Sequence, residues 1–363
     1  MNKKIKRIGL VALAVLLAFS VAACAGGGGG GGAAPATPAA PAPGGDAAAP
    51  DGAAGGDVVE LTFANVSIAT AVEAGEVFKE VAERESGGTL VINHHPMNVL
   101  GDDRSVVELT AFGEIHLATS STSPIASMHN DLFVFDAPYL FLSEEQADEI
   151  LQGPIGQQIL EDMTAIGLRG LMFWENGFRY FTSDHIPVNT VDDVSGVTVR
   201  VMENEIHIAL WRALGANPTP MAMPEVFTAL QQGTIDAQEN TIGTIDGFGL
   251  YEIQSHISLT RHVYTPFFVV MHDDTWNSLT SEQQNAIRVA AQASVDFQLQ
   301  AARDNDIRLF NYWENERDIT ISRPTPEAMA EFQARVVDGG VWDLIRSRMD
   351  NPQLMDDILD QLN

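Results

Sequence analysis

The amino-acid sequence predicts an α/β protein of two lobes, each a mainly parallel β-sheet flanked by helices. Apolar segments of strand length alternate with amphipathic segments of helical length from Val58 onward, and this alternation is typical of parallel sheets that helices cover. A second set of such units begins near Arg179. The chain has 363 residues, and the roughly 300 that follow an N-terminal leader and linker are enough for two hydrophobic lobes.

The first 23 residues have the pattern of a signal peptide. A basic start precedes the apolar run 8–19, which is shorter than a membrane span. Small residues at 21–23 stand directly before Cys24, which is the only cysteine of the chain and therefore excludes an internal disulfide. This Val-Ala-Ala-Cys sequence resembles a bacterial lipobox, so we expect lipidation at Cys24. The alternative is an ordinary signal peptide followed by a cysteine at this position by chance.

Residues 24–57 are expected to form a lipidated tether. The glycine run 26–32 and the Ala/Pro/Gly-rich stretch up to Gly56 contain no large apolar residue that a core could bury. Signal peptide (1–23), tether and globular part together predict an extracytoplasmic protein, in the periplasm or on the outer face of the cell membrane. The membrane would be contacted only through the lipid.

The charge of the chain excludes several kinds of partner. It has 49 acidic and 20 basic side chains, a net charge of −29, and the predicted leader contains four of the basic ones. Such an acidic surface argues against binding to nucleic acid or to anionic lipid. Two arginines that lie close together in so acidic a chain would therefore be a local arrangement that holds an anion.

The first part of the globular region alternates strands with helices. Residues 71–85 have apolar side chains at helical spacing and stop before Gly87, and Ser143 and Gln146 are placed as a capping box. The apolar run Leu132–Phe141 is expected to be core near the crossing between the lobes. The expected strands are 59–64, 90–92, 115–118 and 168–174, and the expected helices are 71–85, 105–112, 143–150 and 155–166.

The second part repeats the pattern and then ends in helices. Pro224 and Gly233 fit the first turn and the end of one helix, as proline and glycine often do. A long helix with apolar side chains on one face is expected from Glu282 to about Arg317. The other expected elements are strands at 197–201, 234–237, 263–271 and 319–321, helices at 206–214 and 224–233, and a helical tail from 326.

Arg179, Arg200 and Asn240 are the strongest candidates for a binding site, because each stands at the end of a short apolar segment. A guanidinium group matches a carboxylate with two parallel hydrogen bonds and keeps its charge, and an asparagine can donate to a carboxylate or a hydroxyl. The alternative is that each arginine pairs with a nearby acid such as Glu175 or Glu203.

Weaker candidates follow from position. The hydroxyl-rich run Thr119–Ser123 comes at the end of an expected strand, where ligands of α/β sheets bind, although it can equally be a polar surface loop. Met223 follows a proline turn and can be either core or the wall of a pocket. No metal-ligand spacing, nucleophile motif or phosphate-binding glycine loop is present, so we expect no metal, no cofactor and no enzyme activity.

Several ordered motifs resemble a known family. They are 177–183 (GFRYFTS), 214–222 (LGANPTPMA), 225–233 (EVFTALQQG) and 236–240 (DAQEN), together with the turns 100–104 and 135–139. From about Val58 to its end the chain resembles the solute-binding proteins of tripartite ATP-independent periplasmic (TRAP) transporters, of the DctP type. The resemblance implies a periplasmic-binding-protein-like fold in which long strands and a long helix join two lobes, expected at 58–178 with 265–312 and at 179–264 with 313–363.

The resemblance also implies roles for individual residues. Arg200 falls on the arginine that binds the ligand carboxylate, Arg179 on a second pocket arginine and Asn240 on the pocket asparagine. Other positions that line the site in the family correspond to Ser120, Ser121, Asp103, Glu203 and Met223. The ligand would be a small organic acid, such as a dicarboxylate or a sugar acid, and the partners would be the TRAP membrane subunits. The alternatives are a ligand-sensing module for a membrane receptor and an extracytoplasmic enzyme acting on organic acids.

Overall fold

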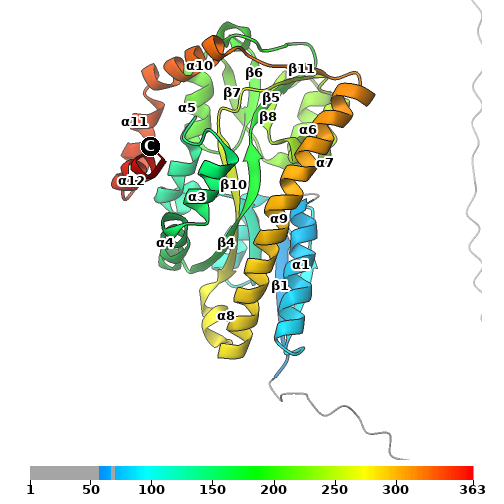
Figure 1. Cartoon of the computed structure of the whole chain (residues 1–363), viewed down its shortest axis with the longest axis vertical. Helices are drawn as coiled ribbons and strands as arrows, with labels where there is room; N and C mark the ends of the chain where they lie inside the picture. Colours follow the sequence, from blue (N-terminus) through cyan, green and yellow to red (C-terminus); the bar gives the residue numbers. More distant parts are fainter. Residues whose placement is uncertain (1–56, 67–69, 363) are drawn as a thin grey trace, which may run out of the picture. The chain divides into compact units, whose positions relative to one another are not determined.

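Two β-sheets with helices on their faces organise the computed structural model, which describes residues 57–66 and 70–362 (Figure 1). The predicted signal peptide, Cys24 and the tether up to residue 56 lie outside the described residues. No helix in the described part is both long and apolar enough to cross a membrane. The predicted α/β class with two helix-flanked sheets is confirmed.

Sheet A has five strands and combines both directions. Its strand β1 pairs in parallel with β2 and β3, whereas β10 runs antiparallel to β3 and β4. The side chains of β10 are buried on both faces up to Met271, which explains its nearly continuous apolar sequence. The strand order is β2 (Leu90–His95), β1 (Val59–Asn65), β3 (Leu117–Ser121), β10 (Tyr264–His272) and β4 (Leu168–Phe178).

Sheet B has six strands and is mixed in the same way. Its strand β6 pairs in parallel with β7 and β8, and β5 runs antiparallel to β8 and β9. The order is β11 (Thr320–Ser322), β9 (His256–Ser258), β5 (Tyr180–Ser183), β8 (Ala237–Asn240), β6 (Thr198–Val201) and β7 (Asn217–Pro220). The chain passes between the sheets at Phe178–Tyr180, where β4 ends and β5 begins, and again between β9 and β10.

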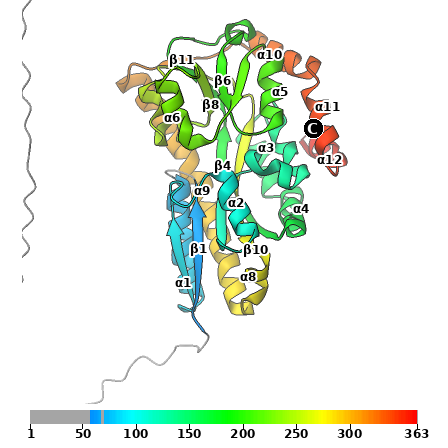
Figure 2. The same cartoon turned by 180° about the vertical axis from the view of Figure 1, so that it is seen from behind.

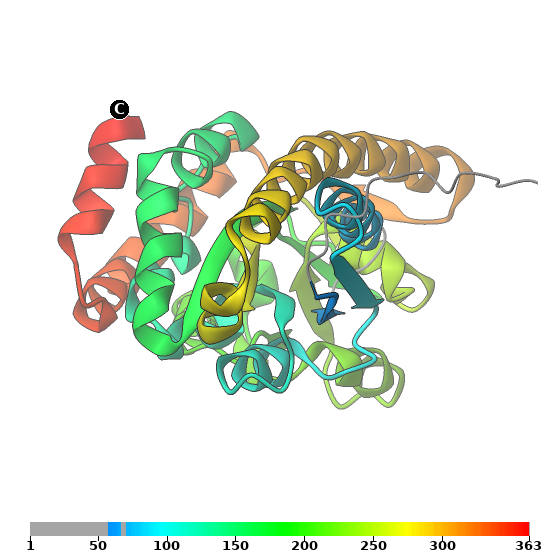
Figure 3. The same cartoon turned by 90° about the horizontal axis from the view of Figure 1, so that it is seen from below.

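The helix α9 (Ser281–Glu316) begins and ends within one residue of the predicted positions. Thr280 and Gln283 form a capping box at its start. Figure 1 shows α9 alongside α1 (Thr70–Glu85) and continuing toward α7 (Ile242–Gly247), and Figure 3 shows the C-terminal helices on the side away from it. This helix therefore spans the height of both sheets, as the family resemblance implies.

The remaining helical elements cover the sheet faces and the C-terminal region. Figure 2 shows α2 and α6 on the side away from α9. The remaining α-helices are α2 (Asp103–Ala111), α3 (Glu144–Leu151), α4 (Pro154–Asp162), α5 (Glu205–Ala213), α6 (Met223–Gln231), α8 (Asp273–Ser278), α10 (Pro326–Asp338), α11 (Val341–Arg348) and α12 (Gln353–Leu362). The 3₁₀ segments are η1 (Ser123–Met128), η2 (Asn130–Asp136), η3 (Met163–Ile166), η4 (Val191–Val194) and η5 (Leu250–Glu252).

Two strands lie further along the chain than the sequence predicts. β3 covers 117–121 instead of 115–118, and β8 covers 237–240 instead of 234–237. In both cases the strand continues through polar residues whose side chains are buried, and an apolar pattern cannot mark such residues. The same burial shows that the hydroxyl-rich run 119–123 is not a surface loop.

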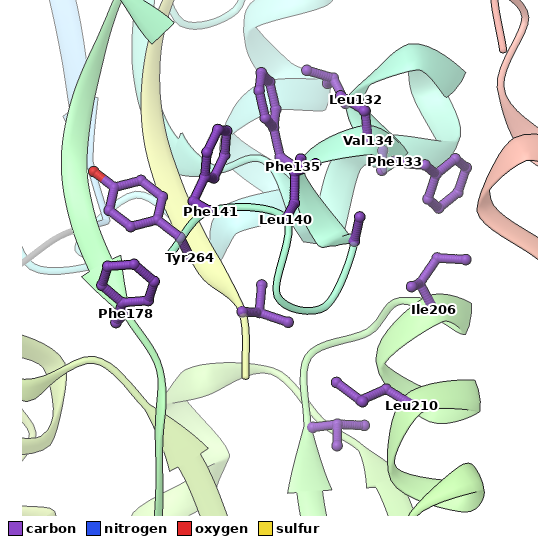
Figure 4. Close-up of a cluster of buried hydrophobic side chains, with 14 of the residues drawn as sticks. Leu132, Phe133, Val134, Phe135, Leu140, Phe141, Phe178, Ile206, Leu210 and Tyr264 are labelled. Atoms are coloured by element: carbon purple, nitrogen blue, oxygen red, sulfur yellow. The ribbon is translucent and has the colours of Figure 1, made fainter. Parts of the chain in front are cut away.

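The hydrophobic core has two parts. One cluster lies between sheet A, α1 and α9 and includes Phe78 and Trp174. The other is continuous from the buried run 132–141 through the β4 and β10 strand ends to α5, as the side chains of Phe135, Phe178 and Leu210 illustrate (Figure 4). The predicted core segment 132–141 is thus buried where the two sheets meet.

Candidate ligand-binding site

A cavity lies where the carboxyl ends of β3, β6 and β8 meet the first turns of α2 and α6. Ligands of open α/β sheets bind at such strand ends. The space open to the centres of water molecules is about 40 Å³. Seven predicted site residues line it, namely Asp103, Ser121, Arg179, Arg200, Glu203, Met223 and Asn240.

Arg200 on β6 is buried and has one donor group without a partner. Its Nε donates to the Met221 carbonyl oxygen at 2.8 Å, and its Nη2 donates to the same oxygen. The remaining Nη1 is buried and makes no hydrogen bond within the described residues. Burial and the neighbouring Arg179 lower the pKa of the Arg200 guanidinium to about 10. An unpartnered buried donor is unfavourable by about 1–3 kcal/mol, and an anion in the cavity would relieve this.

Arg179, in contrast, already has an acid partner. Its Nη2 donates to Glu239 Oε1 at 3.0 Å and to the Glu239 carbonyl oxygen at 2.7 Å, and its Nε donates to Glu239 Oε2. His262 Nε2 lies 2.9 Å from Glu239 Oε2. Burial alone would raise the pKa of Glu239, but Arg179 and His262 outweigh it and hold the pKa far below its ordinary value. The alternative that Arg179 pairs with an acid is therefore correct, but the acid is Glu239 and not Glu175 or Glu203.

Asp103 begins α2 and is held against the end of β3. Its Oδ1 accepts hydrogen bonds from the Ser121 amide at 2.8 Å and from Ser120 Oγ at 3.1 Å. Ser120 itself does not line the cavity and supports Asp103 from behind. Burial raises the pKa of Asp103, although the two serine hydrogen bonds and Arg200 act against this.

Asn240 and Met223 lie together on the other side of the cavity. The Asn240 Nδ2 atom is 3.4 Å from Met223 Sδ, and its Oδ1 accepts from the Thr241 amide at 3.0 Å. Met223 is the first residue of α6, whose N-cap residue Ala222 offers no side-chain hydrogen bond. Pro224 has no N–H group and the Glu225 amide donates to the Ala222 carbonyl oxygen at 3.2 Å, so the first turn of α6 contributes side chains to the lining and no pair of free amides. Glu203 is exposed and lies at the rim.

Comparison with known proteins identifies the family. The family of bacterial extracellular solute-binding proteins, family 7 (DctP), matches residues 65–338. The chain belongs to this family. It is therefore a solute-binding protein of the TRAP type, and the predicted two-lobed, periplasmic-binding-protein-like fold is confirmed.

Relatives of this solute-binding protein bind different acids. The sugar acid binding protein DctPAm of Advenella mimigardefordensis, solved with galactonate, is 30% identical with a TM-score of 0.80 over 84% of this chain and 97% of that one. A solute-binding protein of Verminephrobacter eiseniae is 36% identical over 60% of this chain and 64% of its own length. The C4-dicarboxylate-binding periplasmic protein DctP of Rhodobacter capsulatus is 29% identical over 61% of this chain and 66% of its own length.

Asn176 is a cavity residue that the sequence analysis missed. The ladder between β4 and β10 shifts register between Thr265 and Pro266, so Asn176 has no partner in the ladder. Such a bulge redirects a side chain. Asn176 Oδ1 accepts from Thr241 Oγ1 at 2.8 Å, and its Nδ2 lies 3.5 Å from Ser121 Oγ. The Asn-Gly pair with Gly177 was a usable signal of this irregularity.

Metal binding has no support in the described part of the chain. Within residues 57–66 and 70–362, no three His, Cys, Asp or Glu side chains form a group that could hold a metal ion. The acids near the cavity instead contact serines, arginines and histidines. The arrangement therefore offers hydrogen bonds and charge to a ligand.

Proposed function

We propose that this solute-binding protein captures an organic acid in the cavity and delivers it to the membrane subunits of a TRAP transporter. The observation that supports the proposal most is the buried Nη1 of Arg200, which has no hydrogen-bond partner within the described residues and belongs to a side chain that lines the cavity. A ligand carboxylate is the partner that a guanidinium group fits best.

Binding and lobe closure would be one event. In an open form water hydrates Arg200, whereas closure removes that water and is favourable only when an anion replaces it. Asn176 contacts Thr241 after β8 and Ser121 at the end of β3, so it joins elements of both sheets beside the cavity. A hinge motion biased by such contacts is a common response of two-lobed proteins to a ligand. We expect the lobe boundaries to be those predicted from the sequence.

Native mass spectrometry of the purified protein, followed by calorimetry with the acid that it releases, tests the proposal. We expect a bound organic acid in the parent and at least a 30-fold weaker affinity in Arg200→Ala, since truncating one partner of a buried charged pair costs about 2–5 kcal/mol. Arg212→Ala is the control, because Arg212 is an exposed arginine on α5. Equal binding by Arg200→Ala, or absence of any bound or binding acid, would contradict the proposal.

Two further features belong to the same proposal. We infer that the protein performs no chemical step on the acid, and recovery of the unchanged acid after prolonged incubation tests this. Anchoring through a lipid on Cys24 would keep the protein at the membrane face. Cell fractionation of Cys24→Ser checks the anchor, because release of folded protein is expected and retention at the membrane would argue against it.

A further inference from the structure

We infer that the cavity selects hydroxylated acids with one carboxylate over dicarboxylates, and that Asp103 sets this preference. The inference rests on the proposed function, because it concerns the same cavity. Such a preference separates the two kinds of acid named for the relatives, a sugar acid and C4-dicarboxylates.

The first step is the number of cations left for a ligand. Arg179 and Arg200 are the basic side chains among the cavity-lining residues. Arg179 is neutralised by Glu239, which takes both its Nε and its Nη2 and is itself fully buried. Among the residues that the structure describes, Arg200 donates hydrogen bonds to the Met221 carbonyl oxygen alone. Arg200 is therefore the one cation of the lining that has no carboxylate partner among the described residues. A single ligand carboxylate is enough to pair with it.

The second step is the sign of the charges that remain. The acidic side chains of the lining are Asp102, Asp103 and Glu203. Asp102 accepts from the Ser105 amide at 2.8 Å as the cap of α2, and Glu203 is exposed, so water weakens its effect. Asp103 is the acid held in place beside Arg200. A second ligand carboxylate would find acids and no free cation.

The third step is the hydrogen-bonding capacity of Asp103. Its Oδ1 is occupied by the Ser121 amide and Ser120 Oγ. Its Oδ2 makes no hydrogen bond to any residue that the structure describes. An ionised carboxylate only accepts hydrogen bonds, so the ionised Asp103 can bind a ligand hydroxyl and repels a ligand carboxylate. Asn240, Asn176 and Thr244, which also line the cavity, likewise suit hydroxyl groups.

Matched pairs of acids test this inference. Glycerate and tartronate, threonate and tartrate, and galactonate and galactarate differ only in that a terminal CH₂OH is replaced by a carboxylate. Calorimetry at pH 7.5 with the full chain should show the first member of any pair that binds to be at least tenfold tighter than the second. Asp103→Asn keeps an Oδ1 acceptor for Ser121 and should reduce that ratio to about threefold or less by improving dicarboxylate binding.

The control is Asp274→Asn, which removes one negative charge from an exposed position on α8 and should leave the ratio unchanged. Equal affinities within a pair, or a ratio unaffected by Asp103→Asn, would overturn the inference and leave organic-acid binding intact. If no pair binds, the acid released in native mass spectrometry decides, because two carboxylates overturn the inference and one with hydroxyls supports it. Absence of any acid would instead defeat the proposed function.

Discussion

At the scale of single residues, the burial of Glu175 has a measurable consequence. The residue is 5% exposed, its Oε2 accepts from Arg303 Nε at 2.9 Å, and Arg303 Nη2 donates to Asp148 at 2.7 Å. Burial raises the pKa of Glu175 from 4.5 to about 7, with Arg303 opposing the rise and Asp148 and Glu144 adding to it. The sequence alternative pairs Glu175 with Arg179 or Arg200, whereas the structure pairs it with Arg303 on α9, 128 residues away, which sequence proximity cannot indicate.

The raised pKa predicts how stability depends on pH. Between pH 4.5 and 7 the folded protein keeps the Glu175 proton that the unfolded chain has lost, so the stability that this proton contributes is lost as pH rises through that window. Glu175→Gln removes this loss, which amounts to about 3 kcal/mol at about 1.4 kcal/mol per pH unit. Urea denaturation at pH 5 and pH 8 should show the variant gaining relative to the parent at pH 8.

The exposed Glu114 provides the control, since Glu114→Gln should give the same difference from the parent at both pH values. A Glu175→Gln difference that does not change with pH would mean that Glu175 is ionised in the folded protein throughout.

At the scale of elements, sequence prediction succeeds where apolar periodicity is strong and fails where polar side chains are buried. The predicted range 282–317 agrees with α9 (Ser281–Glu316) because its apolar face repeats over many turns. The apolar pattern predicts β8 three residues early because Gln238, Glu239 and Asn240 are buried in the strand. The same failure hid the partner of Arg179, since the buried Glu239 on β8 pairs with this arginine, which directly precedes β5 and lies 60 positions away in the chain.

Most of the candidate site was predictable for a related reason. Residues at the carboxyl ends of strands are brought together whatever the details of the strands, so Ser121, Arg200 and Asn240 line one cavity. Ser120 points to Asp103 instead, because adjacent residues of a strand face opposite sides. Asn176 was missed since it depends on a bulge, which shifts one residue out of register.

Asn176 is expected to contribute to ligand affinity through this bulge. Asn176→Ala removes its contacts to Thr241 and Ser121. The loss of hydrogen bonds of ordinary strength should weaken binding by about tenfold, since a tenfold change in affinity corresponds to about 1.4 kcal/mol. Asn176→Asp keeps the acceptor for Thr241 but adds a negative charge beside the ligand, so it should weaken binding further. Calorimetry with the released acid ranks the three proteins.

The exposed Asn315 at the end of α9 gives a matched control, and Asn315→Ala should bind as the parent does. Parent-like binding by Asn176→Asp would show that the Asn176 side chain is remote from the ligand charge.

At the scale of the whole molecule, a continuous core and a strongly negative charge set the conditions for binding. One hydrophobic cluster reaches from the 132–141 segment through Phe178 and Tyr264 to α5, so the two sheets share buried contacts on that side. Motion that opens the cavity must preserve those contacts, because apolar burial contributes about 25 cal/mol per Å². The cavity side, where polar contacts such as those of Asn176 join the sheets, can separate at lower cost.

The net charge of −29 predicts an unusual salt dependence of association. An anionic ligand approaches a molecule of its own sign, and this repulsion reaches about 30 Å at 0.01 M salt but only about 8 Å at 0.15 M. Arg200 attracts the ligand only near the cavity, since it is buried. The association rate constant should therefore rise about two- to threefold over this range of salt, opposite to the fall seen for oppositely charged partners. Stopped-flow fluorescence measures both rate constants, and the dissociation rate constant should change little because buried contacts are poorly screened. An association rate constant that falls with salt would show that the local field of Arg200 extends beyond the cavity and outweighs the acidic surface.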